Sequence, residues 1–356
     1  MQLKTTTSKP DFPIEWNEQL AAWTVWQYAD IIEILKNPLF TPNPTATINK
    51  SAPSPPTHDF SAYRSPFSQV LQKKSAWTRK QMAETAQAIC KKLDQQKTFD
   101  LQKHFILPWC QQIAIRLTGI EVESTEFNLL YEYAEQVFLM TDGNNKEAAH
   151  IATSFLSQYF LQLLYQCRQF PKEDLVSLLA QNEQAPAIFI APIVQLFVGT
   201  VTSLPLLLGN VMFTLLTHPE QAQQFITEPY RFVNELIRYA GPAQFIYRSA
   251  ISDVQIGNHF FKKSDRIALL LSHANQDSQA FKNPNQFNLN KSSTAHLSLG
   301  KGAHACLGSP LIRDACAILP TMILKCFPHL QPKMSEVSWG GSQAIWGVKE
   351  LLVDKE

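Results

Sequence analysis

A long uncharged stretch runs from Ala185 to Thr217, and it constrains the fold more than any other part of the sequence. Its length and hydropathy would allow it to span a bilayer. It also contains three prolines and the polar residues Gln195, Thr200 and Asn210, which are costly in lipid, and the sequence has no second stretch of this kind. We therefore expect a long helix buried in the middle of a large soluble domain.

Composition and charge narrow the classes of function. The chain has 356 residues, of which 45% are apolar, so it can bury a large core. Its 31 basic and 30 acidic residues give a net charge of +1, which offers no electrostatic footprint for nucleic acid or an anionic membrane. The N-terminal residues lack the apolar core of a signal peptide. We expect a cytoplasmic monomer that binds a small molecule, with no nucleic acid and no membrane as partner.

The hydrophobic pattern predicts a mainly α fold with small β sheets. Residues 1–59 are irregular, with a strand at 23–28, a helix that stops at Asn37-Pro38 and a proline-rich loop at 41–59. Residues 60–240 show helix after helix, and residues 241–356 contain strand-like segments, among them 266–272. No long period repeats, so we expect one domain that covers residues 1–356.

The sequence GKGAHACLGSP at residues 300–310 surrounds Cys306 with three of the chain's 12 glycines. The six cysteines form no CxxC pair, which argues against a disulfide framework or a zinc site, and the other five are expected in the core. Ser309 and Pro310 predict a helix with Ser309 as its N-cap. A helix N-terminus lowers the pKa of a nearby thiol, so Cys306 is predicted to be a nucleophile or a metal ligand, with a buried cysteine in a turn as the alternative.

The segment HLSLGKGAHACLGSPLIR at residues 296–313 resembles the heme-binding loop of the cytochrome P-450 family, with Leu299 in the position of the family's phenylalanine. Three further segments resemble the family in the same order along the chain: LLTHPEQ at 215–221, FVNELIRYAGP at 232–242 and ANQDSQAFKNPNQFNL at 274–289. The resemblance implies the cytochrome P-450 fold as a single triangular domain. It also implies heme b, with the Cys306 thiolate as the axial ligand of the iron.

The same resemblance implies which residues hold the cofactor. Arg248 and His304 would contact the heme propionates, and Glu235 with Arg238 would form a buried pair that braces the heme loop. Taken alone, this pair would be an ordinary surface ion pair. The implied cofactor-binding residues are Cys306, His304, Arg248, Leu299, Gly300, Gly308, His58 and Arg64.

The sequence departs from the family pattern in the long uncharged helix. In GTVTS at residues 199–203, Thr202 occupies the position of the family's acid and Ser203 that of its threonine. Both are the predicted catalytic residues, yet Thr202 cannot exchange protons near neutral pH as a carboxylate can. Pro205 lacks the N–H that would bond the carbonyl of Val201, which predicts a distorted helix and a site for water. Gln286 replaces an arginine that many members carry.

Three classes of function remain open at this point. The first is a monooxygenase that oxidises a small or medium organic molecule in secondary metabolism, with electrons from a ferredoxin and its reductase. The second is a heme-thiolate enzyme outside the reductive oxygen cycle: a peroxide-driven oxidant, a dehydratase or an isomerase. The third is a catalytically silent heme or ligand-binding protein.

A basic cluster for docking an acidic redox partner comprises Lys73, Lys74, Arg79 and Lys80, with a solvated helix face as the alternative. The expected substrate pocket comprises Phe197, Val198, Gln244, Phe245 and Ile345.

Overall fold

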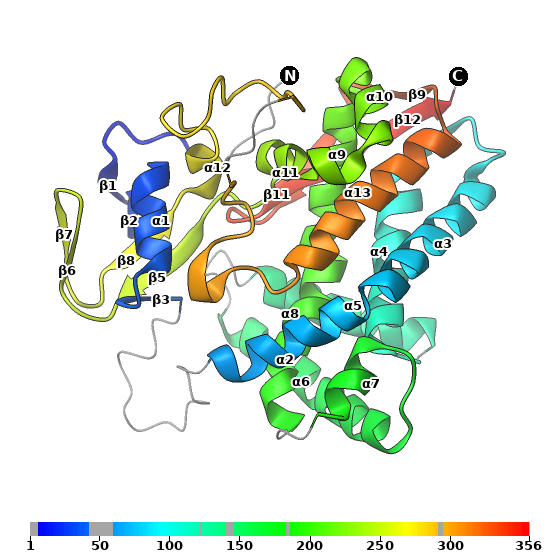
Figure 1. Ribbon diagram of the computed structural model, residues 1–356, viewed down its shortest axis with the longest axis horizontal. Helices are drawn as coiled ribbons and strands as arrows, with labels where there is room; N and C mark the ends of the chain where they lie inside the picture. Colours follow the sequence, from blue (N-terminus) through cyan, green and yellow to red (C-terminus); the bar gives the residue numbers. More distant parts are fainter. Residues whose placement is uncertain are drawn as a thin grey trace.

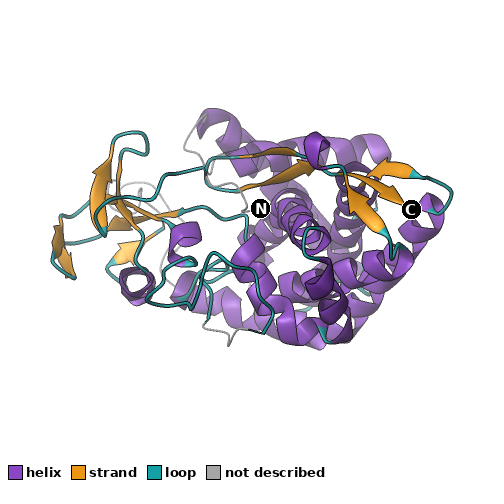
Figure 2. Ribbon diagram, turned by 90° about the horizontal axis from the view of Figure 1, so that it is seen from above, coloured by secondary structure: helices purple, strands orange, loops and turns teal. Residues whose placement is uncertain are grey.

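The computed structural model describes residues 6–42, 60–121, 123–139, 146–182, 186–290 and 295–355. Most of its helices gather in one body, and a smaller β-rich part lies beside them (Figure 1). Viewed from above, the strands of the β-rich part occupy one end of the molecule, and a second group of strands covers part of the helical body (Figure 2). The prediction of a mainly α fold with small sheets is confirmed.

The uncharged stretch forms the central helix of the body. It consists of a 3-10 turn η4 (Pro186–Phe189), α8 (Ile190–Val198), a π-helical turn η5 (Gly199–Ser203) and α9 (Leu204–Leu216). Among the described residues, Ile190–Leu216 is the one helix long and apolar enough to cross a membrane, and 61% of its most apolar window is buried inside the protein. Every residue of α9 is buried. The expectation of a buried central helix is therefore confirmed.

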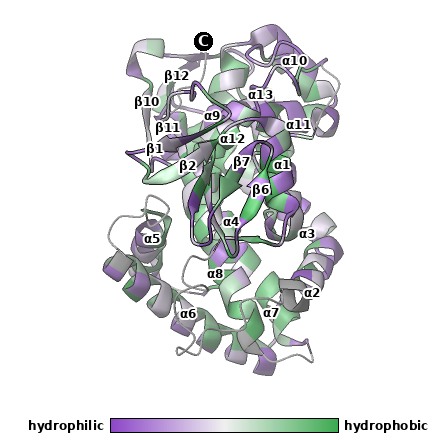
Figure 3. Cartoon of the chain, turned by 90° about the vertical axis from the view of Figure 1, so that its left-hand side faces the viewer, coloured by the Kyte–Doolittle hydropathy of each residue, from purple (hydrophilic) through white to green (hydrophobic). Residues whose placement is uncertain are grey.

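The other helices of the body surround this central helix. Figure 3 shows the hydrophobic colour along the interior helix α8 and a mixture of hydrophilic and hydrophobic residues along the outer helix α6. Their bounds are α2 (Phe60–Lys73), α3 (Ser75–Leu93), η2 (Gln102–Ile106, π-helical), α4 (Leu107–Thr118), α5 (Ser124–Leu139), α6 (Lys146–Gln169), α7 (Leu175–Ala180), α10 (Pro219–Thr227), α11 (Pro229–Ala240) and α13 (Ser309–Cys326).

A five-stranded sheet is the centre of the β-rich part. Its strand order is β1 (Ile14–Asn17), β2 (Ala22–Val25), β8 (Arg266–Leu269), β5 (Ile246–Ala250) and β3 (Phe40–Thr41). Only the β2–β8 pair is parallel. The hairpin β6 (Val254–Ile256) and β7 (His259–Phe261) and the helices α1 (Tyr28–Lys36) and α12 (Leu271–Ala274) belong to the same part. Residues 271–272, which the strand-like pattern included, are helical.

Two small sheets lie on the helical body. One has the order β4 (Thr98–Asp100), β12 (Leu352–Lys355) and β9 (Leu330–Pro332). The other is the hairpin of β10 (Ser338–Gly341) and β11 (Trp346–Glu350), which packs against α9. Asn210 of α9 joins the two layers, because its Oδ1 accepts a hydrogen bond of 2.9 Å from the Val348 N–H.

Candidate functional site

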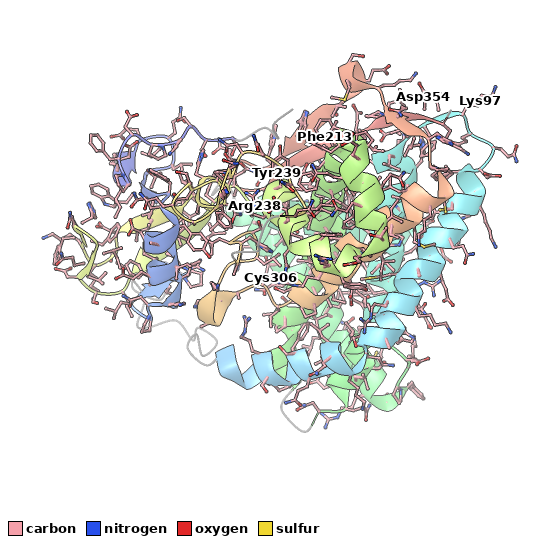
Figure 4. The ribbon with its side chains drawn as sticks, turned by 45° about the horizontal axis from the view of Figure 1, so that its top comes forward. Lys97, Phe213, Arg238, Tyr239, Cys306 and Asp354 are labelled. Atoms are coloured by element: carbon pink, nitrogen blue, oxygen red, sulfur yellow. The ribbon has the colours of Figure 1, made fainter. Side chains whose placement is uncertain are left out.

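A cavity of about 470 Å³ separates the central helix from the loop that precedes α13. We call this loop, residues 295–308, the Cys306 loop. Leu299, Gly300, His304, Cys306 and Gly308 line one wall of the cavity. Figure 4 shows Cys306 where the β-rich part meets the helical body. The central helix forms the opposite wall with Gln195, Leu196, Gly199, Thr200, Ser203, Leu204 and Leu207.

The Cys306 loop depends on two glycines with a left-handed backbone. Gly300 has φ +67° and Gly302 has φ +74°, and a Cβ at Gly302 would lie 2.4 Å from the Leu35 carbonyl oxygen. The Cys306 N–H donates to the Leu299 carbonyl over 2.8 Å, which closes the loop. The loop therefore presents its cysteine on a backbone that close contacts hold in place.

The start of α13 differs in detail from the prediction. Pro310 lies in the first turn as expected, but Gly308 is the N-cap and Ser309 is the first helical residue. The Ser309 hydroxyl donates to the Cys306 carbonyl over 2.6 Å, so it stabilises the loop and not the helix N–H groups. The helix still begins directly after the cysteine.

The predicted lowering of the Cys306 pKa is wrong for the protein alone. Burial among protein atoms raises the pKa of the thiol, and this effect outweighs the opposing hydrogen bond from Gly308, the charge of Arg64 and the hydrogen bond from Ser309. The exposed surface of Cys306 faces the cavity, and protein atoms surround the rest of the residue. A metal ion at the sulfur would reverse the balance, because a coordinating thiol is deprotonated outright.

Three basic side chains line the cavity, and no acidic side chain of the described residues does. Arg248 is 5% exposed, and its Nη1 donates to the Tyr247 carbonyl over 2.7 Å. Burial lowers the pKa of Arg248 to about 10. Burial also lowers the pKa of His304, with smaller effects from Arg248 and Arg64. Arg64 donates from Nη2 to the Ala305 carbonyl over 2.8 Å. A buried guanidinium without a carboxylate partner is costly, so this wall fits a ligand that brings acidic groups of its own.

Glu235 and Arg238 form the buried pair that the resemblance implied. Their side chains are 8% and 3% exposed, and Arg238 donates from Nε and Nη2 to the two carboxylate oxygens over 2.7 and 2.8 Å. Arg238 Nη1 also donates to the carbonyls of Asn275 and Pro284 over 2.6 and 3.0 Å. Four of the five guanidinium N–H groups are thus used by protein acceptors.

Asn275 connects this pair to the Cys306 loop, a role that the sequence reasoning did not assign. Its Oδ1 accepts from the Leu297 N–H over 2.7 Å, and its Nδ2 donates to the Ser298 hydroxyl over 2.9 Å. Ser298 in turn donates to the Ile237 carbonyl over 2.9 Å. The signal in the sequence was the segment at 274–289, which resembles the family without naming a contact. Gln286, in place of the arginine, leaves the Glu235–Arg238 pair intact.

The predicted catalytic residues lie on different faces of the central helix. Ser203 lines the cavity, and its hydroxyl donates to the Gly199 carbonyl over 3.1 Å. Thr202 does not line this cavity, and its hydroxyl donates to the Val198 carbonyl over 2.7 Å. Both belong to the π-helical turn directly before Pro205. The predicted distortion of the helix is present as this widened turn.

One of the five residues expected in the substrate pocket lines this cavity. Ile345 lines the cavity, whereas Phe197, Val198, Gln244 and Phe245 do not. On the central helix the cavity face repeats at residues 196, 199, 200, 203, 204 and 207, so residues 197 and 198 face other helices. Phe197 contacts Phe127 and Phe160 in the core. His58 lies outside the described residues.

The basic cluster on α2 and α3 has acidic neighbours for three of its four members. Lys74 lies 3.6 Å from Glu173, Arg79 4.0 Å from Asp314 and Lys80 3.8 Å from Glu84.

The five cysteines outside the loop carry no disulfide, and four of them are buried while Cys326 is half-buried. Among the described residues no group of three or more His, Cys, Asp or Glu side chains could hold a metal ion. Cys306 would have to act as a single protein ligand.

Comparisons with known proteins agree with this geometry. A family model described as cytochrome P-450 matches residues 230–338. Cytochrome P-450 109 of Bacillus spizizenii is 27% identical over 363 residues, 96% of this chain and 88% of that protein. The solved structure of the bacillaene polyketide synthase cytochrome P-450 PksS of Bacillus subtilis is 25% identical, with a TM-score of 0.86 over 97% of this chain and 94% of that chain. The chain belongs to the cytochrome P-450 family.

The fold of a cytochrome P-450 is also present in the solved complex of cytochrome P-450 BioI with an acyl carrier protein ligated to hexadec-9Z-enoic acid. That structure is 23% identical, with a TM-score of 0.84 over 97% of this chain and 95% of that chain. The cofactor of the family is heme b with a cysteine thiolate as axial ligand. Arg248 is buried without an acidic partner among the described residues, and Cys306 faces the apolar central helix across the cavity, so both fit such a group. The chain is an oxidoreductase of this family.

Proposed function

We propose that this cytochrome P-450 is a monooxygenase that inserts one oxygen atom of O₂ into a small or medium organic molecule of secondary metabolism. The observation that carries the proposal is the cavity in which Cys306 and three basic side chains face the central helix. Heme held by a cysteine thiolate supplies the oxidation of unactivated bonds when it is bound there. The relative PksS is a polyketide biosynthesis protein by name, which supports a substrate of this class.

The residues of this chain have separate tasks in the proposal. Cys306 would ligate the iron, and Arg248, Arg64 and His304 would bind the propionates by charge-assisted hydrogen bonds. Apolar side chains such as Leu204 and Ile345 keep bulk water from the reacting centre. The Ser203 hydroxyl can turn from the Gly199 carbonyl and donate a hydrogen bond into the cavity.

Electrons would come from an acidic ferredoxin with its reductase. The cluster Lys73, Lys74, Arg79 and Lys80 lies where α2 ends and α3 begins, and its ion pairs with Glu173, Asp314 and Glu84 reduce its net charge. We therefore expect docking that depends on ionic strength but is weak.

Absorption spectroscopy and turnover test the proposal together. The reduced protein with carbon monoxide is expected to show the strongly red-shifted Soret band of a thiolate-ligated heme. NADH with a ferredoxin and its reductase should then support substrate oxidation that requires O₂. A protein with the red-shifted band that turns over only with hydrogen peroxide would belong to the second class of function, outside the reductive oxygen cycle. A band at the histidine-type position would overturn the proposal.

A further inference from the structure

A second cavity of about 230 Å³ lies on the other side of the central helix. The two cavities share this helix as a common wall: Gly199, Ser203 and Leu207 line the first, and Val201 and Thr202 line the second. The full lining of the second cavity is Asp100, Gln102, Lys103, Leu107, Tyr131, Glu135, Phe138, Val201, Thr202, Pro205, Leu206, Lys349 and Glu350. Unlike the first cavity, it contains carboxyl groups.

The central helix departs from regular α-helical hydrogen bonding where it separates the two cavities. The turn Gly199–Ser203 is π-helical, and Pro205 has no N–H to donate to the Val201 carbonyl as an α-helix would require. The Thr202 hydroxyl donates to the Val198 carbonyl and keeps its lone pairs for a donor such as water. Gln102, which is 6% exposed, donates from Nε2 to the Pro205 carbonyl over 3.0 Å. Its Oε1 has no hydrogen-bond partner within the described part of the chain.

The three carboxyl groups in this cavity differ in their surroundings. Asp100 is committed to structure, because its Oδ1 accepts from the backbone N–H groups of Gln102, Lys103 and Leu351. Glu350, Lys103 and Lys349 are exposed and mark the side of the cavity that faces solvent. Glu135 is half-buried.

The partner of Glu135 lies inside the same cavity. Its Oε1 accepts a hydrogen bond of 3.0 Å from the Tyr131 hydroxyl, one turn earlier on α5. Burial raises the pKa of Tyr131, and the neighbouring Glu135 charge raises it further, so the phenol keeps its proton and can relay one. The Tyr131 hydroxyl, the Glu135 carboxyl and Thr202 thus belong to residues that line one cavity, which is large enough for several water molecules.

We propose that Glu135 delivers the protons of the reaction through water in the second cavity to Thr202, and so replaces the acid that the central helix lacks. This inference rests on the proposed monooxygenase function. The balanced reaction is R–H + O₂ + 2 H⁺ + 2 e⁻ → R–OH + H₂O, with both electrons from the redox partner. Each proton leaves the Glu135 carboxyl for a water molecule and reaches the Thr202 hydroxyl. Thr202 passes its own proton through water at the π-helical turn into the first cavity, where it is consumed in the water that the balanced reaction releases, and the hydroxyl is restored by the incoming proton. The Glu135 carboxylate regains a proton from solvent.

The decisive comparison is between Glu135→Gln and Glu132→Gln in the heme-loaded enzyme. Glu132 lies on the same helix but is exposed and outside the cavity, so it is a matched control. We expect Glu135→Gln to lower the O₂-driven turnover by about a hundredfold, the low end of what a positioned proton donor contributes. Turnover driven by hydrogen peroxide should stay unchanged, because peroxide already carries the two electrons and two protons. Glu135→Asp, and Thr202→Asp in the Glu135→Gln background, should restore most of the O₂-driven rate.

A second readout does not depend on turnover. The ionisation of Tyr131 is followed by ultraviolet absorbance, as the difference between proteins with and without Tyr131→Phe. We expect Tyr131 to titrate at lower pH when Glu135→Gln removes the carboxylate, and to be unchanged by Glu132→Gln.

Each failure has a distinct signature. Wild-type protein that turns over only with peroxide would remove the proposed function and this inference with it. O₂-driven turnover that is equal in Glu135→Gln and Glu132→Gln would overturn the inference and leave the monooxygenase function intact. Equal loss of the O₂-driven and peroxide-driven rates, without rescue by Glu135→Asp, would assign Glu135 a structural role and overturn the inference as well.

Discussion

The two walls of the main cavity differ in how they are built. The Cys306 loop is fixed by glycine geometry, close backbone contacts and the hydrogen bonds from Arg238 through Asn275. The central helix, on the other side of the cavity, has irregular backbone hydrogen bonds because of the π-helical turn Gly199–Ser203 and Pro205. Holding a cofactor requires a rigid wall, whereas moving protons requires polar groups and room for water. Changes in the Cys306 loop should therefore affect the stability of the fold and the absorption spectrum of the bound heme. Changes in the central helix should affect the amount of product formed per NADH consumed.

The largest effect is expected from Cys306→Ser. The hydroxyl cannot serve as a thiolate ligand, so the red-shifted carbon monoxide band should disappear and turnover should fall by more than about a hundredfold, since even outer partners of a metal site cost 10–100-fold. Cys326→Ser, which changes a half-buried cysteine at the other end of α13, is the control and should retain the band. Normal spectra and activity in Cys306→Ser would contradict the assignment of the ligand.

The next effect concerns the brace behind the rigid wall. Arg238→Ala leaves the buried Glu235 carboxylate without its partner and removes two carbonyl contacts, so it should lower the free energy of unfolding by about 3–5 kcal/mol. Arg231→Ala is a matched control, because Arg231 and Glu228 form an i, i+3 pair at the start of α11 whose side chains are 68% and 54% exposed. That variant should lose less than about 1 kcal/mol. Urea unfolding measures both, and similar losses would show that burial of the pair is unimportant.

A smaller effect, dependent on pH, is expected from His296 at the start of the Cys306 loop. This side chain is 8% exposed, and neither ring nitrogen has a hydrogen-bond partner among the described residues. Burial lowers the pKa of His296 to about 4, with smaller effects from the positive charges of Arg313, Arg238 and Lys301. The unfolded chain therefore binds a proton that the folded protein excludes, and stability falls as the pH falls from about 6.5 toward 4.

His296→Leu tests this linkage. Between about pH 7 and pH 5 the wild-type protein should lose about 2 kcal/mol more stability than the variant. The free energy of unfolding at the two pH values gives this difference directly, and carboxylates that titrate in both proteins cancel from it. An equal loss in both proteins would mean that the imidazole is protonated in the folded state.

The same contrast between the walls explains what the sequence could predict. The Cys306 loop is local in sequence, so its glycines, its cysteine and the helix after it could be placed correctly, apart from the role of Ser309. The distorted helix also follows from a single residue, Pro205. The substrate-facing residues could not be placed, because a shift of one residue moves a side chain by 100° around a helix and the π-helical turn changes the phase. The second cavity joins α5, η2, the central helix and β11, which are distant in sequence, so no local pattern could indicate it.

The smallest effect on stability, and the sharpest test of the contrast, is expected from Pro205→Ala. The new N–H could bond the Val201 carbonyl, which contributes about 0.5–1.5 kcal/mol, while the greater freedom of alanine in the unfolded chain costs about 0.4–1 kcal/mol. These contributions offset each other, so unfolding should change by less than about 1 kcal/mol. If water at this turn carries protons, the regular turn should reduce product formed per NADH and increase hydrogen peroxide. Pro219→Ala, at the start of α10 and outside both cavities, controls for the loss of a helix-initiating proline. Unchanged product yield in Pro205→Ala would show that the loosened wall is a tolerated packing defect, and protons would then have to cross the helix without help from the π-helical turn.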